Sequence, residues 1–523
     1  DRSPSRGLGD VYKRQELVLT NREENNSMEL QTTPRQIKAP SFLDASIPLV
    51  VLVFLLSLSV FLYGSDSSYG ANQIALFVAA FVGVVIGLKN GYGWAEIEQA
   101  MVKGISLSLG ALLILFSVGA LIGTWLLAGT VPSLIYYGLQ LLDPSWFYAA
   151  SCLLCAVVAL SIGSSWTTAA TIGVALIGVA SGLGMSPAVT AGAIVSGAYF
   201  GDKMSPVSET TNLAPAVAGS NLFDHIRHMT WTTIPSLVMA LIIFAVMGFN
   251  ADAAADDSQI RAISDALQQH FSISPLMLVP LLVLMAMAVK KVPAFPTVFI
   301  GALLGGIWAV LFQPELVAKM ADPQLNGVLA TLKVVWTTLH GGFVIETQNA
   351  ELDKLLNGGG MVKMLNTCWL IFSAMMFGAV LEHIGLLRKF VEAILHKAHS
   401  TGSLITSTIA TCIATNILTA DQYMSIVMPG RMFKEEYERR GLAPVNLSRT
   451  LEDGGTITSP LIPWNTCGAY MHGVLNVNPL DYAMYAFFNL INPVLAVIYA
   501  YMGIKVLKLT PPDTPITAAV QGK

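Results

Sequence analysis

Charged residues are scarce in this chain of 523 residues: they account for 12% of it, whereas 54% of the residues are hydrophobic. The mean hydropathy is +0.61. A soluble core cannot absorb so many apolar residues, so the composition excludes an ordinary soluble domain and indicates a protein that crosses a membrane several times. The net charge of −4 gives no reason to expect a nucleic-acid partner.

Cysteine is scarce as well, with five residues, each of which lies in or beside an apolar segment. Cys152 and Cys155 have the spacing of half a metal site, but no second cluster accompanies them, so packing is the favoured role. The chain also lacks the HExxH and GxSxG motifs and any cluster of histidines with carboxylates inside an apolar run. These absences disfavour a membrane-embedded enzyme, and we expect no cofactor.

Long apolar runs are what the chain has in abundance. Segments such as 47–64, 105–129 and 231–249 have about the ~20 residues needed to cross ~30 Å of hydrocarbon. We therefore predict an all-α polytopic membrane protein with roughly 10–11 transmembrane helices. The exact number depends on segment 327–345, which is apolar but carries Lys333 and His340.

The first 27 residues differ from the rest, because they are polar and precede Met28, which is typical of a sequence-end artefact rather than of folded protein. No short apolar segment with a small-residue cleavage site precedes residue 45, which favours a retained first helix over a cleaved signal. The apolar runs suggest this division: a cytoplasmic tail at 1–44, a first transmembrane half at 45–250, a periplasmic loop and linking helices at 251–314, a second transmembrane half at 315–508, and a C-terminal tail at 509–523.

Short echoes link the two halves at a spacing of roughly 256 residues. The matching pairs are AEIEQAM at 95–101 with AELDKLL at 350–356, LFSVGA at 115–120 with IFSAMM at 371–376, and NLFD at 221–224 with NPLD at 478–481. Because the three echoes keep their order, they indicate an internal repeat.

The distribution of Lys and Arg predicts that the two repeats are inverted. Residues 129–145 contain neither, whereas the corresponding loop at 386–400 contains Arg388, Lys389 and Lys397. Since Lys and Arg favour cytoplasmic loops, we expect the two loops on opposite faces of the inner (cytoplasmic) membrane. Both chain termini are then cytoplasmic.

Polar residues interrupt the apolar runs twice in each half. We predict a re-entrant hairpin in each half, with tips at IGSSWTT (162–168) and NILTADQ (416–422). Each hairpin is followed by a helix that is broken at GDKMSPVSETTN (201–212) or at EDGGTITSPLIPWNT (452–466). Irregular backbone at membrane depth is tolerated only around protein or a wet cavity, so the breaks predict a ligand site.

Carboxylates in these breaks predict that the ligand is a cation. Each costs at least ~2.5 kcal/mol at the bilayer centre unless it binds a proton, a partner or a cation, and the nearby hydroxyl and amide oxygens suit a hard cation. A carboxylate that holds either a proton or a metal ion gives the minimal mechanism of exchange. We expect Glu209 and Asp453 to supply one such carboxylate per half, with Asp202, Asp421 and Glu452 nearby.

Structural roles compete with this interpretation. Lys203 could simply neutralise its neighbour Asp202, and the hydroxyls at the tips could only satisfy helix backbone. His225 and His228, on either side of Arg227, are typical of a solvated cytoplasmic loop.

Two stretches, GDKMSPVSETTNLAPAVAGSNLFDHI at 201–226 and LEDGGTITSPLIPWNTCGAYM at 451–471, resemble the NhaC family of sodium/proton antiporters. The resemblance extends from residue 45 to residue 508 and implies an ion-transporter fold that exchanges sodium for protons by alternating access. At the breaks it implies cation-binding positions within 208–212 and 458–466, namely Ser208, Glu209, Thr210, Thr211, Asn212, Thr458, Asn465 and Thr466. The acids and oxygen donors of the breaks themselves add Asp202, Ser205, Asp453 and Thr456 to this set. At the tips the corresponding positions are Ser164, Ser165, Thr167, Thr168, Asn416, Thr419 and Asp421, with Lys203 as a charge partner.

The resemblance leaves the substrate open. Some family members exchange organic acids such as malate and lactate, so the alternative function is a sodium- and proton-coupled organic-anion exchanger. A carboxylate substrate would need a free cationic partner or helix N-termini in the cavity, and Lys203 is the only basic residue in 201–214. The expected partners are thus sodium, protons and the lipid bilayer, with small organic acids as the alternative cargo, and dimers of related folds leave a homodimer open.

Overall fold

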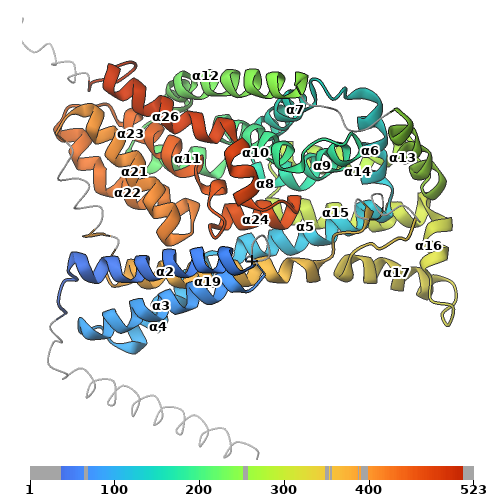
Figure 1. Cartoon of the computed structure of the whole chain (residues 1–523), viewed down its shortest axis with the longest axis horizontal. Coiled ribbons are helices and arrows are strands. Elements are labelled where there is room, and N and C mark those ends of the chain that lie inside the picture. The colour runs from blue at the N-terminus through green and yellow to red at the C-terminus, as the bar shows by residue number, and fades with distance from the viewer. Residues whose placement is uncertain are drawn as a thin grey trace, which may run out of the picture.

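The protein is described by a computed structural model over residues 37–63, 67, 69–250, 257–347, 353, 356–386, 388–389 and 399–509. Within these ranges every regular element is a helix, which confirms the predicted all-α class (Figure 1). Up to residue 250 the α-helices are α2 Phe42–Tyr63, α3 Ala71–Lys89, α4 Trp94–Leu107, α5 Leu109–Leu127, α6 Thr130–Leu141, α7 Phe147–Ile162, α8 Ser165–Thr168, α9 Val174–Gly182, α10 Pro187–Met204, α11 Glu209–Ala218 and α12 Leu222–Phe249.

The later α-helices complete the fold. They are α13 Asp257–His270, α14 Val279–Val289, α15 Ala294–Phe312, α16 Pro314–Met320, α17 Val328–Gly341, α19 Leu365–His383, α21 Thr401–Thr419, α22 Gln422–Arg439, α23 Pro444–Leu451, α24 Thr466–Leu475, α25 Pro479–Tyr482 and α26 Phe487–Met502.

The number of membrane crossings agrees with a polytopic protein. Among the described residues eight helices are long and apolar enough to cross, and the number is ten if each of two helix pairs, bent by 85° and 56°, is one span. The helix α17, in the segment whose crossing was in doubt, has 14 residues. At ~1.5 Å per residue it is about 21 Å long, which is too short to cross ~30 Å of hydrocarbon.

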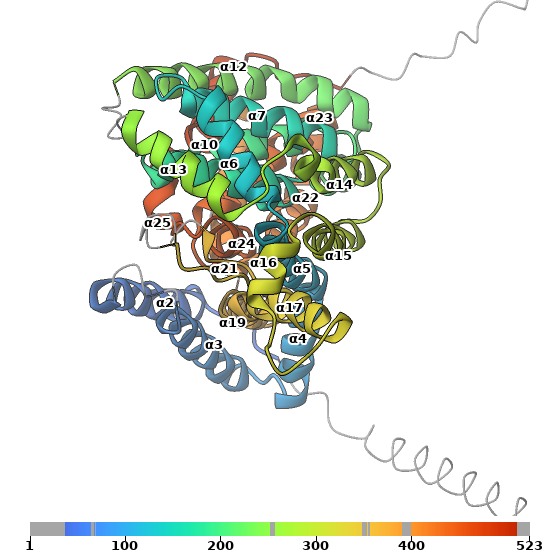
Figure 2. The same cartoon turned by 90° about the vertical axis from the view of Figure 1, so that its right-hand side faces the viewer.

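The helices form layers, which can be seen in two views at right angles to each other. In Figures 1 and 2, α12 lies along one face of the molecule and α2 and α3 along the opposite face. The long face of α2 is poorly covered by protein, with Leu43, Val50, Phe54 and Phe61 more than half exposed, as expected of a helix in contact with lipid.

Both predicted hairpin tips are confirmed as breaks with the same local construction. At the first tip Gly163 ends α7 in the left-handed conformation (φ 75°), and the Ser164 side chain then accepts a hydrogen bond from the Thr167 N–H at 3.2 Å. At the second tip Ala420 is left-handed (φ 56°), and the Asp421 side chain accepts from the Met424 N–H at 2.8 Å. A left-handed residue followed by a capping side chain ends one helix and starts the next.

The two ends of each hairpin meet. The Ser186 N–H donates to the Tyr148 hydroxyl at 3.0 Å, which joins the start of α7 to the residue before α10. In the second hairpin Arg440 Nη1 donates to the Ser400 carbonyl at 2.8 Å, and α21 packs along α22. Segments that leave and return at one end are what a re-entrant hairpin requires, while their orientation relative to the membrane stays a prediction.

Both predicted helix breaks are present as well. α10 ends at Met204 and the chain resumes at α11, where the Ser208 side chain caps the helix. In the second half α23 passes into a π-helix at Glu452–Thr456 and a 3₁₀ turn at Ser459–Leu461 before Asn465 caps α24.

Close backbone contact fixes α10 against α7. A Cβ atom added at Gly197 would lie 2.0 Å from the Cys152 carbonyl oxygen, and one at Gly201 would lie 2.4 Å from the Ala156 carbonyl oxygen. Only glycine allows this approach, so α7 and α10 form one rigid pair. Cys152 and Cys155 lie in this contact, and all five cysteines are buried and free, as the packing interpretation expects.

Some expectations fall outside the described residues or are not tested. These residues include 1–36, most of the AELDKLL echo at 350–356, Lys397 and 510–523. The echo at NLFD and NPLD has a structural counterpart, because Asn221 caps α12 and Asn478 caps α25 in the same way. The inverted relation of the halves and their boundaries at 45, 251, 315 and 509 stay predictions.

Candidate functional site

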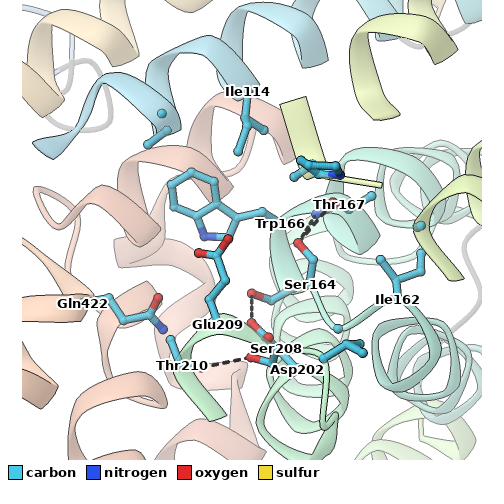
Figure 3. Close-up of a pocket in the computed structure, with 18 of the residues that line it drawn as sticks. Ile114, Ile162, Ser164, Trp166, Thr167, Asp202, Ser208, Glu209, Thr210 and Gln422 are labelled. Carbon is cyan, nitrogen blue, oxygen red and sulfur yellow. Dashed lines mark hydrogen bonds between the residues drawn. The ribbon is translucent and has the colours of Figure 1, made fainter. Parts of the chain in front are cut away.

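A cavity of about 830 Å³ lies where the two tips and the first break meet (Figure 3). Three carboxylates line it, Asp202, Glu209 and Asp421. The other polar lining residues that were predicted are Ser164, Ser165, Thr167, Ser208, Thr210, Asn212 and Thr466. The structure therefore brings together residues of both halves, from positions more than 200 apart in sequence.

Asp202 connects the first break to the first tip. It lies at the end of α10, is 7% exposed, and accepts a hydrogen bond from the Ser165 hydroxyl at 2.7 Å. The Thr211 hydroxyl donates to the backbone carbonyls of Asp202 and Lys203, at 3.1 and 2.9 Å. The Asp202 carboxylate and the hydroxyls of Ser165, Ser208 and Thr210 belong to residues of one lining, and such hard oxygen ligands suit a cation.

Glu209 and Asp421 face the cavity from opposite halves. Glu209, at the start of α11, accepts a hydrogen bond from the Tyr423 hydroxyl on α22. Asp421 caps α22 and lines the same space. The amide of Asn212 closes the first break by donating to the carbonyls of Pro206 and Ser208, at 2.9 and 2.7 Å.

Polar side chains of the second tip and of the second break bond to one another. Asn416 Nδ2 donates to the Gly455 carbonyl at 2.6 Å and to the Thr458 hydroxyl at 3.1 Å, and Asn465 Nδ2 donates to Asn416 Oδ1 at 3.1 Å. These three side chains do not line the cavity. Apart from Asp453 and Lys203, the remaining predicted positions outside the lining are Thr168, Thr211 and Thr419, which donate to backbone carbonyls, and Ser205 and Thr456, whose buried hydroxyls have no hydrogen-bond partner among the described residues. Glu452, expected nearby, is fully buried and does not line the cavity either.

The expected place of Asp453 needs correction. It does not line the cavity; it is fully buried and forms an ion pair with Lys203, which also donates to Asn492 Oδ1 at 2.9 Å. The Thr232 hydroxyl donates to the same Asp453 oxygen at 3.1 Å. The pairing of Lys203 with Asp202 is therefore wrong, because successive residues of a helix do not face each other. Lys203 and Asp453 join the two halves behind the cavity.

The two histidines also differ from expectation. His225 is fully buried and His228 is 5% exposed, so they are not part of a solvated loop. They lie three residues apart near the start of α12, on one face that turns inward, while Arg227 lies on another. Their spacing was the signal that could have revealed this.

Several cavity residues were missed. Trp166 and Tyr423 contribute aromatic walls, and Lys291, in the turn after α14, contributes an exposed ammonium group to the lining. The position of Trp166 in the first tip and that of Tyr423 directly after the second tip could have indicated them, whereas Lys291 is brought there only by tertiary packing. Within the described ranges no three His, Cys, Asp or Glu residues lie close enough together to form a metal-binding group.

Comparison with known proteins identifies the family of the chain. Residues 11–199 and 197–504 match the Na+/H+ antiporter family. The Na(+)/H(+) antiporter NhaC of Alkalihalophilus pseudofirmus is 38% identical over 83% of this chain and 91% of its own length.

Two further relatives are named for the transport of other substrates. The malate-2H(+)/Na(+)-lactate antiporter of Bacillus subtilis is 37% identical over 90% of this chain and 96% of its own length. The arginine/ornithine antiporter ArcD of Halobacterium salinarum is 35% identical over 92% of this chain and 96% of its own length. With the family match covering nearly the whole chain, this multi-pass membrane protein belongs to the Na+/H+ antiporter family.

Proposed function

We propose that the protein is a secondary active transporter that exchanges sodium for protons across the cytoplasmic membrane, with both termini in the cytoplasm. The observation that carries the proposal is the cavity at the helix breaks, where Asp202, Glu209 and Asp421 come together with uncharged oxygen donors. The NhaC relatives, which are named as Na(+)/H(+) antiporters, support the same choice of ions.

The chain's own residues suggest how exchange works. A carboxylate at this depth is costly unless a cation or a proton neutralises it, so Asp202 holds one or the other. The Ser165 hydroxyl donates to Asp202 at 2.7 Å and fixes it against the tip, while the nearby carbonyls of residues 202 and 203 are held by Thr211. Either ion neutralises the Asp202 carboxylate, and alternate opening of the cavity to the two sides then moves sodium one way and protons the other.

Competition at one site gives a test. Sodium flux in proteoliposomes that contain only this protein, measured against sodium concentration at several symmetrical pH values, should show an apparent sodium constant that rises about tenfold per unit decrease in pH once the site is protonated. The maximal rate should stay constant until a second group titrates. A pure fall in maximal rate at constant apparent affinity would contradict a shared site.

A second candidate function is a sodium- and proton-coupled organic-anion exchanger. Two observations favour it: the cavity volume of about 830 Å³ is in the range of small-molecule sites, and Lys291 offers a cationic group at the lining. Lys203 does not serve this purpose, because Asp453 already neutralises it.

Added organic acids separate the two candidates. For sodium/proton exchange we expect sodium flux to be unchanged within about twofold when malate or lactate is added, and equally in Lys291→Ala, because no anion takes part. The measurement is sodium uptake with each acid present or withheld. Flux that requires malate or lactate, and that Lys291→Ala reduces, would establish the organic-anion exchanger instead.

A further inference from the structure

A second pocket, of about 600 Å³, lies apart from the cavity and shares none of its lining residues. Its polar lining consists of Tyr69, Ser186, His472, Asn476, Asn478, Asp481 and Tyr485. One carboxylate and several neutral oxygen donors face this space, and its described lining contains no Lys or Arg. Such a lining suits a cation better than an anion.

Two helices run from the cavity to this pocket. On α10, Asp202 lines the cavity and Ala188 lines the pocket, and the 14 residues between them correspond to about 21 Å of helix. On α24, Thr466 lines the cavity and Asn476, the residue that caps its end, lines the pocket, which corresponds to about 15 Å. The cavity and the second pocket therefore lie at opposite ends of both helices.

An aromatic stack occupies the path between them. Trp166, from the first tip, borders the cavity, and its ring stacks on that of Tyr470, with centroids 4.0 Å apart and planes 17° from parallel. Tyr470 is fully buried on α24, between Thr466 and His472, and its hydroxyl donates to the Trp166 carbonyl at 3.1 Å. The stack thus joins the first hairpin to the second broken helix.

We propose that the second pocket is the vestibule through which a monovalent cation enters or leaves on the other side of the membrane, and that the Trp166–Tyr470 stack is the gate that closes it in this state. The inference rests on the proposed exchange function and adds its route. The two rings belong to different halves, so rocking of one half against the other separates them. Stacking and one hydrogen bond are weak enough to break in each cycle.

Thiol labelling tests the route. In a background without the five native cysteines, Gly110→Cys and Ala188→Cys place one thiol in each space; Gly110 lines the cavity and has no neighbouring atom within 4 Å of an added Cβ. A membrane-impermeant reagent should label the two thiols from opposite sides. Labelling of both from one side would overturn the assignment of the vestibule.

Crosslinking tests the gate. In the same background Trp166→Cys with Tyr470→Cys, joined by a short bifunctional thiol reagent, should lose at least about tenfold of its sodium flux, and cleavage of the crosslink should restore it. Each single variant treated with the same reagent is the control. Full flux in protein shown by mass to be crosslinked would overturn the gate.

Two substitutions of Tyr470 distinguish loss of the gate from a folding defect in the double-cysteine variant. Tyr470→Phe keeps the stack and should keep coupled exchange, whereas Tyr470→Ala should raise sodium leak without proton counterflow about tenfold. Leak that is equal in the two variants would count against the gate. If the cysteine-free parent itself exchanges no sodium for protons, the proposed function fails; if the parent is active and the crosslink has no effect, only the gate fails.

Discussion

Asp202→Asn should reduce sodium/proton exchange by roughly 100-fold or more while folded protein remains in the membrane, because the contact between a cation and this nearly buried carboxylate is worth several kcal/mol. The amide keeps an oxygen that can accept the Ser165 hydrogen bond, which measures 2.7 Å in the native protein, but it cannot bind a proton or balance a cation. The measurement is sodium flux in proteoliposomes driven by a pH gradient.

Asp143→Asn is the matched control for this substitution. Asp143 lies in the exposed turn between α6 and α7 and accepts hydrogen bonds only from Ser145 among the described residues. It should keep native flux. If Asp202→Asn also kept native flux with unchanged sodium dependence, the cavity carboxylate would have no part in transport.

Removing Asp453 should destabilise the protein more than removing Lys203. Asp453 is fully buried and faces two cations, Lys203 and the Nε of Arg449 at 3.8 Å, which is buried as well. Asp453→Asn leaves both charges uncompensated, at a cost of about 3–5 kcal/mol in the free energy of unfolding. Lys203→Met leaves Asp453 paired with Arg449 and should cost less.

Together with the double variant, the two single variants form a double-mutant cycle that measures the coupling between Lys203 and Asp453. Lys203→Met combined with Asp453→Asn should recover part of the midpoint of thermal unfolding in detergent that Asp453→Asn loses, because one of the two unpaired cations is gone. A midpoint for Asp453→Asn no lower than that of Asp143→Asn would show that the buried pair contributes nothing to stability.

The irregular parts of the fold could be predicted from the sequence. The tips at 162–168 and 416–422 and the breaks at 201–212 and 452–466 are where the helices end. Glycine, proline and capping side chains end or start a helix within a few residues of their own position. An interrupted apolar run therefore predicts a helix break from the local sequence alone.

Contacts between side chains that are far apart in the sequence could not be predicted in this way. Lys203 and Asp453 lie 250 positions apart, and nothing local distinguishes Asp453 from Asp202 as the acid that Lys203 meets. The same holds for the cavity carboxylates, where Asp202, Glu209 and Asp421 take the place that Glu209 and Asp453 were expected to hold. Long-range packing decides which face of each broken helix turns toward the site.

The cavity also determines where the membrane voltage acts. At ~30 Å³ per molecule, 830 Å³ accommodates roughly 28 waters, enough to carry the potential of the adjoining solution down to Asp202. A membrane potential is worth ~2.3 kcal/mol per elementary charge per 100 mV, and most of it then falls across the packed layer around Trp166 and Tyr470 rather than along the cavity. An ion that reaches Asp202 has crossed little of the electric field. Voltage therefore acts mainly on the passage between the two aqueous spaces, and hardly on the binding of sodium.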